Sequence, residues 1–106
     1  MTQAALPGDE DRKLITLARA ARARTQADSG GAVRDDTGRS YAGADVNLPS
    51  LTLTGLEVAV AQAVSAGARG IEGAAVVGDR EVPIDVVRDA GGSGVPVWRA
   101  DRSGVP

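Results

Sequence analysis

The sequence contains neither cysteine nor histidine, and this absence removes most metal and nucleophile chemistry. None of its 106 residues supplies a thiolate or an imidazole, so we expect no zinc site, no histidine-dependent catalytic triad and no disulfide. Phenylalanine is also absent, and Tyr41 and Trp98 are the only aromatic residues, so the core must be built from aliphatic side chains. A partner subunit would help to stabilise such a thin core.

Charge and hydropathy argue against two further classes of partner. Twelve basic and fourteen acidic side chains give a net charge of −2, which leaves no basic surface to bind nucleic acid through its phosphates. No apolar stretch approaches the length of a membrane span and no segment resembles a signal peptide, so we expect a cytoplasmic protein. The length predicts a single domain over residues 1–106, with residues 1–8 flexible and residues 101–106 forming a tail.

Hydrophobic periodicity predicts two well-defined helices. Acidic residues precede apolar positions spaced three and four apart, so residues 10–25 are expected to be helical. A second apolar stripe predicts a helix over residues 54–67. Val58 and Ala61 lie off this stripe, so we expect the second helix to be covered on two sides, by a sheet and by a partner chain.

The remaining segments predict strands and one short helix. We expect a hairpin with its turn at residues 35–38, a break at Asn47–Ser50 and a buried strand over 71–77. A helix is expected over 81–90 with Pro83 in its first turn, and a last strand over 95–100, in which the proline indicates an edge or a strand start. The resulting order α-β-β-α-β-α-β predicts an α/β fold in which helices flank a mixed sheet.

Three short motifs look functional but have structural explanations. Asp36-Thr37-Gly38 matches the tripeptide of aspartic proteases, yet its charged neighbours are typical of a hairpin turn. Gly91-Gly92-Ser93-Gly94 lacks the lysine and spacing of a phosphate-binding loop, and we interpret it as a helix end. Thr54 and Glu57 have the spacing of a capping box, which predicts a helix start between them.

The succession of short motifs over roughly residues 10–100 resembles the cytidine deaminase family. The matching segments are, in chain order, Gly30–Val33, Asp36–Val46, Leu51-Thr52, Val58-Ala59, Ala63–Gly67 and Ala74–Val77, followed by Pro83 and Arg88. Members of this family hydrolyse cytidine or deoxycytidine with a zinc ion, and they are usually homotetramers or dimers. The resemblance therefore implies a sheet flanked by helices and a nucleoside-related function.

The positions that carry the chemistry of this family are altered here. Zinc deaminases need a Cys or His followed by Ala-Glu at one helix start, and Pro-Cys-x-x-Cys at another. The first ligand position falls on Thr54 and the catalytic glutamate on Leu56, although a shift by one residue would place Glu57 there. The two cysteine positions fall on Ile84 and Val87. The alignment therefore leaves no protein ligand for zinc and implies no cofactor.

The resemblance also places Asp45 and Asn47 where the family holds the nucleoside sugar with an Asn and a Glu. Our first hypothesis is a catalytically inactive cytidine deaminase-like protein that acts as a structural or interaction module. It would form a homo-oligomer, a dimer or a tetramer, through the helix over residues 54–67, or bind an unidentified protein partner. Two alternatives stay open: a zinc-independent module that binds a nucleoside or another small molecule, and a hydrolase that is active only with a partner subunit.

Overall fold

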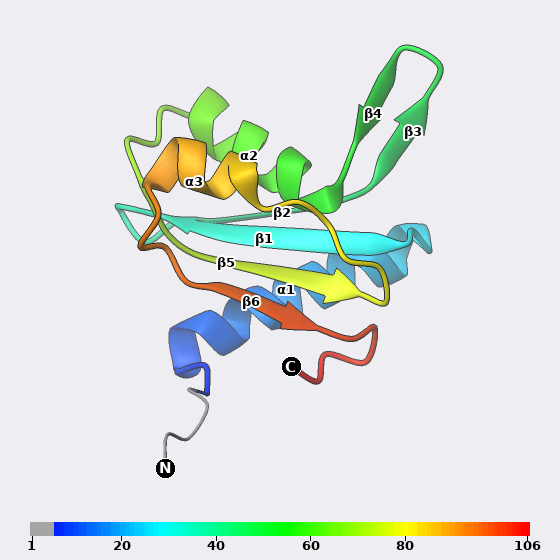
Figure 1. Cartoon of the computed structure of the whole chain (residues 1–106), viewed down its shortest axis with the longest axis horizontal. Helices are drawn as coiled ribbons and strands as arrows, with labels where there is room; N and C mark the ends of the chain where they lie inside the picture. Colours follow the sequence, from blue (N-terminus) through cyan, green and yellow to red (C-terminus); the bar gives the residue numbers. More distant parts are fainter. Residues whose placement is uncertain (1–5) are drawn as a thin grey trace.

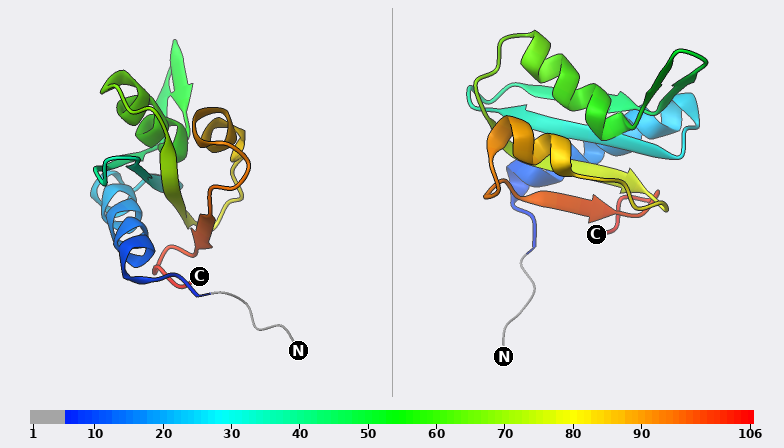
Figure 2. Two further views of the ribbon diagram at one scale, coloured as in Figure 1. Left: turned by 90° about the vertical axis from the view of Figure 1, so that its left-hand side faces the viewer. Right: turned by 45° about the horizontal axis from the view of Figure 1, so that its top comes forward.

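The computed structural model describes residues 6–106. A mixed sheet forms the middle layer of the fold, and helices cover both of its faces (Figures 1 and 2). The elements are α1 (Asp9–Thr25), β1 (Ser29–Asp35), β2 (Ser40–Ala44), β3 (Val46–Leu48), β4 (Leu51–Leu53), α2 (Gly55–Ser65), β5 (Ile71–Gly78), α3 (Asp85–Gly91) and β6 (Val97–Ala100). The strand order in the main sheet is β2-β1-β5-β6. Strand β1 is antiparallel to both β2 and β5, whereas β5 and β6 are parallel. The predicted fold class is confirmed.

Each face of the sheet carries its own hydrophobic core. Helix α1 buries Leu14, Ile15 and Ala18 against β1, β5 and β6 on one face. Helices α2 and α3 lie on the opposite face, where Leu56 and Val87 join a larger cluster. Of the stripe that the spacing predicts, Leu14, Ala18 and Ala21 are buried, whereas Leu17 is 39% exposed and Ile15 is buried instead.

Helix α3 begins later than the sequence predicts. It starts at Asp85 rather than at residue 81, so Pro83 precedes the helix instead of lying in its first turn. The ring of a proline disfavours the helical conformation for the residue before it, here Val82. Val82 is also 2% exposed, and its carbonyl accepts a hydrogen bond of 3.1 Å from the Arg99 guanidinium. Both the proline and the burial of Val82 thus accompany a segment without regular secondary structure over residues 81–84.

A short hairpin occupies the segment in which the sequence analysis predicts only a break. Strands β3 and β4 pair in an antiparallel manner, with Asn47 opposite Thr52. Pro49 and Ser50 lie in the turn between the two strands. The proline lacks an amide hydrogen, but at this position none is needed for the hydrogen bonds between the strands. The hairpin projects away from the main sheet beside the start of α2 (Figure 1).

The sequence analysis predicts a flexible start over residues 1–8 and a tail over residues 101–106. Residues 1–5 lie outside the described residues, and Pro7 just after them is buried. Residues 101–106 form a turn in which the Asp101 carboxylate accepts amide hydrogen bonds from Ser103 and Val105, at 2.9 and 3.0 Å. Between residues 6 and 106, no helix has both the length and the apolar character needed to cross a bilayer.

Candidate functional site

The N-terminus of α2 is held by the capping box that the sequence predicts. The Thr54 hydroxyl accepts a hydrogen bond from the Glu57 amide at 3.1 Å, and the Glu57 carboxylate accepts one from the Thr54 amide at 2.8 Å. Both side chains therefore satisfy backbone groups that a helix start leaves without partners. The Thr54 hydroxyl serves the helix rather than pointing freely outward.

The same helix start lies directly on the backbone of the sheet. A Cβ atom added at Gly31 would overlap the backbone of Leu56, and one added at Gly55 would lie 2.8 Å from the Gly31 nitrogen. Only glycine permits such an approach of helix to strand. Leu56, the next residue of α2, is fully buried between the helix and the sheet.

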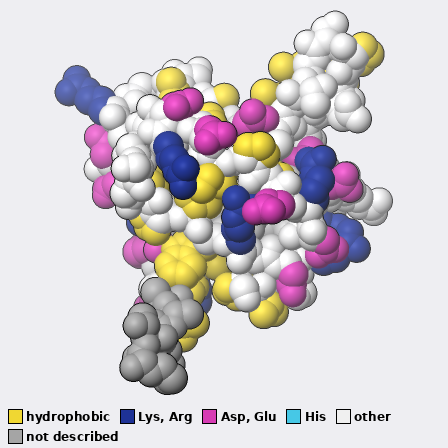
Figure 3. All heavy atoms as spheres, in the orientation of Figure 1, with side chains coloured by type: hydrophobic (Ala, Val, Ile, Leu, Met, Phe, Trp, Pro, Cys, Tyr) yellow, Lys and Arg dark blue, Asp and Glu magenta, His cyan; other side chains and the backbone are white. Residues whose placement is uncertain are grey.

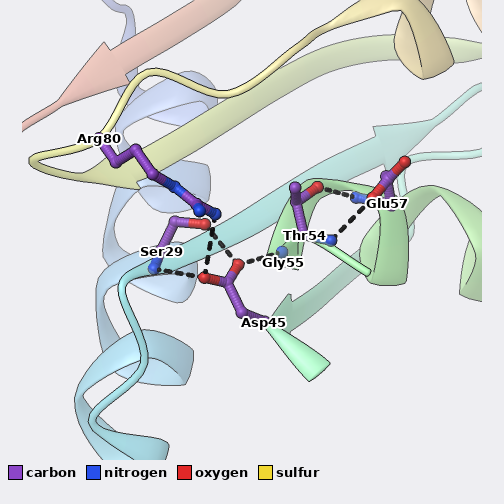
Figure 4. A network of polar contacts seen from close by, with 6 residues as sticks. All are labelled: Ser29, Asp45, Thr54, Gly55, Glu57 and Arg80. Atoms are coloured by element: carbon purple, nitrogen blue, oxygen red, sulfur yellow. Dashed lines mark hydrogen bonds and ion pairs between the residues drawn. The ribbon is translucent and has the colours of Figure 1, made fainter. Parts of the chain in front are cut away.

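The Asp45 carboxylate joins three segments at this point (Figure 4). Its Oδ1 atom accepts hydrogen bonds from the Ser29 hydroxyl at 2.5 Å and from the Gly55 amide at 2.8 Å. Its Oδ2 atom accepts one from the Ser29 amide at 3.0 Å and lies 3.6 Å from an Arg80 nitrogen. The Asp45 side chain is 16% exposed. Its hydrogen bonds and ion pair connect the start of β1, the start of α2 and the loop after β5.

A hollow of about 540 Å³, lined by both polar and apolar groups, opens beside this carboxylate. Asp45, Asn47, Thr54 and Glu57 all line it, together with Arg80 and the segment that follows α1. Asn47 is exposed on β3. The structure therefore brings Asp45 and Asn47 to one hollow, but the carboxylate of Asp45 is already engaged by groups of its own chain.

The other three predicted site residues lie in the core on the α2 and α3 face of the sheet. Leu56 and Val87 are 0% exposed, and Ile84 is half-buried against the same hydrophobic cluster. Their surroundings are aliphatic, with Val33, Val60 and Val76 in the cluster. The three side chains fill space between the helices and the sheet.

A second carboxylate organises the turn between β1 and β2. Asp35 accepts hydrogen bonds from the Thr37 hydroxyl and amide, the Arg39 amide and the Tyr41 hydroxyl, at 2.7 to 3.0 Å. Burial raises its pKa, but these hydrogen bonds outweigh burial and lower the pKa to about 2. Asp36 is exposed, and Gly38 has a φ of 88°, so the protease-like tripeptide forms a hairpin turn as predicted.

Comparison with known proteins identifies the family of this chain. The family model for cytidine deaminase-like proteins matches residues 7–104. The chain belongs to the cytidine deaminase-like family. No curated protein matches the sequence significantly.

Several solved cytidine deaminases share the fold. The enzyme from Mycobacterium tuberculosis is 26% identical, with a TM-score of 0.67 over 87% of this chain and 85% of that chain. The enzyme from Burkholderia pseudomallei is also 26% identical, with a TM-score of 0.67 over 80% of each chain. The enzyme from Mycobacterium leprae is similar in fold alone, at 20% identity and a TM-score of 0.67 over 86% of this chain and 87% of that chain.

The zinc ion of cytidine deaminases does not fit the residues of this cytidine deaminase-like chain. Ile84 and Val87 offer no donor atom, and the Thr54 hydroxyl is committed to the capping box. Zinc in proteins is bound by thiolate, imidazole or carboxylate groups. Within residues 6–106, no three side chains of these kinds converge as a metal site would require.

Two residues at this site were missed by sequence reasoning. Ser29 and Arg80 are the partners of Asp45, but they lie sixteen residues before it and on the loop after β5. Neither belongs to a local motif. Only the antiparallel pairing of β1 with β2 and β5 brings them to the carboxylate, so the fold had to be known first.

Proposed function

We propose that this cytidine deaminase-like protein is catalytically inactive and serves as a structural or interaction module that associates with itself through α2. One observation supports this most: the residues at the family's ligand and acid-base positions serve the fold. Thr54 caps α2, while Leu56 and Val87 are fully buried in the core. We also propose a cytoplasmic location, in keeping with the composition.

Energetics favour these aliphatic residues as parts of the core. Complete burial of a leucine or valine side chain stabilises a fold by about 1.5–3 kcal/mol. This contribution matters in a chain that has no phenylalanine. A metal ligand at Leu56 or Val87 would place a polar group among aliphatic neighbours and reduce stability.

A deamination assay tests the proposal. The purified full chain, with and without added zinc, is incubated with cytidine and deoxycytidine, and ammonia release is followed. A cytidine deaminase such as that from Mycobacterium tuberculosis is the positive control. We expect no turnover and no stoichiometric zinc by elemental analysis. Turnover by the chain alone would overturn the proposal, and turnover that needs a co-purifying protein would favour a hydrolase dependent on a partner subunit.

The hollow beside Asp45 supports a second candidate, a module that binds a nucleoside or another small molecule without zinc. Its volume of about 540 Å³ lies within the range of small-molecule sites. Asn47 is exposed there and is available to bind hydroxyl groups. Calorimetric titration with cytidine, uridine and their deoxy forms is the test, with Asn47→Ala as the matched variant. Heat that disappears in this variant supports binding, and flat titrations of the wild type refute it.

A further inference from the structure

A second hollow opens at the end of the main sheet where β5 and β6 stop. Its volume is about 490 Å³. Strands β5 and β6 are parallel and are joined through α3, so their carboxyl ends lie at the same end of the sheet. In open α/β sheets, ligands bind in the crevice outside the carboxyl ends of the strands. The position of this hollow therefore suits a ligand.

The ends of the two strands and the segments that follow them form the walls of this hollow. Residues 78–81 line it at the end of β5, and residues 99–101 line it at the end of β6. Val105 lines it as well and is 59% exposed, although its side chain is apolar. Small-molecule sites combine such apolar contact surface with a few polar groups that fix the orientation of the ligand.

Two arginine side chains line this hollow, and most of their hydrogen-bond donors are unused. The Arg99 guanidinium donates one hydrogen bond, of 3.1 Å, to the carbonyl of Val82, which is 2% exposed and holds the guanidinium in place. Arg80 has a single ion pair within residues 6–106, in which its guanidinium lies 3.6 Å from the Asp45 carboxylate, beyond hydrogen-bond distance. That carboxylate already accepts three hydrogen bonds from other groups. Since a guanidinium has five N–H donors, both arginines can bind an acceptor in the hollow.

Three carboxylates also line the hollow, but two of them already have partners in the chain. Asp79 lies 3.4 Å from the Arg102 guanidinium, and Asp101 accepts hydrogen bonds from the amides of the turn that follows it. Glu81 is exposed and has no ion pair in the described part of the chain. Figure 3 shows basic and acidic side chains lying beside one another on the face that it draws. Two arginines with unused donors against one unpaired carboxylate favour a ligand with a single anionic group over a polyanion.

We propose that this hollow binds a small organic anion, whose carboxylate or phosphate group is held by Arg80 and Arg99 and whose apolar part lies against Val105. Arginine N–H groups match both of these oxyanions in geometry and in charge. The hydrogen bond that anchors Arg99 reduces the conformational freedom that binding has to restrict. The site needs neither a metal nor a second copy of the chain, so it goes beyond the proposed function and is independent of it.

An NMR titration of the isotopically labelled full chain tests this site with two pairs of probes at constant ionic strength. The pairs are benzoate with acetate and phenyl phosphate with inorganic phosphate. We expect saturable shifts of the amide signals of residues 78–81 and 99–105. Each aromatic anion should bind about fivefold or more tightly than its simple counterpart, because its ring contacts Val105. The aromatic anion that binds more tightly identifies the anionic group, carboxylate or phosphate.

Charge variants give expectations of opposite sign. Arg80→Gln and Arg99→Gln should each raise the dissociation constant of that aromatic anion by about tenfold or more, because each removes charge-assisted hydrogen bonds. Glu81→Gln should lower the constant by about twofold, since it removes a carboxylate that repels the ligand. Arg69→Gln is the matched control and should leave the constant unchanged, because Arg69 is exposed and precedes β5, at the opposite end of that strand.

Thermal unfolding shows whether each variant is folded. Arg99→Gln loses the hydrogen bond to Val82, whereas Arg80→Gln removes an exposed side chain and keeps the test valid if the first variant is unstable. Absence of saturable shifts at this hollow with all four anions overturns the inference. Binding that Arg80→Gln leaves unchanged, or that Arg69→Gln weakens equally, overturns it as well. Equal affinity for each aromatic anion and its simple counterpart refutes the contact with Val105. The deamination assay is independent of all these outcomes.

Discussion

Replacing Asp45 with alanine removes the carboxylate that joins β1, α2 and the loop after β5. The change leaves the Ser29 amide, the Ser29 hydroxyl and the Gly55 amide without their acceptor. Ser29 is 0% exposed and Gly55 is buried, so these donors have little access to bulk water. The variant therefore loses several hydrogen bonds at once, at the point where α2 begins.

The magnitude follows from the donors left unpaired. A buried donor without an acceptor costs about 1–3 kcal/mol, and water entering from the adjacent hollow reduces this cost for at least one of them. We expect Asp45→Ala to lower the free energy of unfolding by about 3 kcal/mol. In a domain of this size that corresponds to a fall in melting temperature of roughly 10–20 °C. The contact with Arg80 adds little, because the Arg80 side chain is 56% exposed.

Urea unfolding followed by circular dichroism measures this loss. Asp79→Ala is the matched control, because the Asp79 carboxylate is 63% exposed and contacts only Arg102, at 3.4 Å, among the described ion pairs. The control should differ from the wild type by less than about 0.5 kcal/mol. Equal stability of Asp45→Ala and Asp79→Ala would refute the structural role assigned to Asp45.

Three further predictions concern other residues of the same framework. Gly31→Ala should lower the free energy of unfolding by at least about 2 kcal/mol in urea titrations, because its Cβ overlaps the Leu56 backbone; Gly94→Ala, with no neighbour within 4 Å, should be close to neutral. Thr54→Ala should cost about 1 kcal/mol through loss of the cap, and an unchanged unfolding midpoint would contradict this. The folded-state pKa of Asp35, lowered to about 2, means that its ionised form stabilises the fold above the usual aspartate pKa and that this contribution is lost as pH falls toward 2. The difference in melting temperature between wild type and Asp35→Asn should therefore be constant near neutral pH and shrink below about pH 4; a constant difference down to pH 2 would refute the role of ionised Asp35.

Elements with a local signal were predictable from the sequence. The start of α2 was expected at Thr54 because the capping box with Glu57 is a pattern of adjacent residues. A turn was expected at residues 35–38 for the same kind of reason, and the structure has it at residues 36–38 because Asp35 is the last residue of β1. Burial of Leu56 likewise follows from its place on the apolar stripe of the helix.

Features that depend on distant segments were not predictable. Ser29 and Gly55 were not predicted as the partners of Asp45, because only the folded sheet brings them near its carboxylate. The hairpin at residues 46–53 was missed because Pro49 indicates a break and the strands on either side have three residues each. The late start of α3 has a local cause, the proline after Val82, and a tertiary one, the burial of Val82, and only the second depends on the fold.

The two aromatic residues of the chain both lie on strands of the main sheet, but their side chains pack against different hydrophobic clusters. Tyr41 packs against the cluster beneath α2 and α3, and its hydroxyl donates to Asp35. Trp98 packs against the cluster beneath α1, and its indole donates to Asp11 at 2.9 Å. Each of the two hydrophobic cores thus has its own optical reporter, free of interference from any phenylalanine or second tryptophan. Tyrosine and tryptophan emission can be recorded in one thermal unfolding experiment. Coincident transitions indicate a fold that unfolds as a unit, and separate transitions indicate a fold that loses its two helical layers in succession.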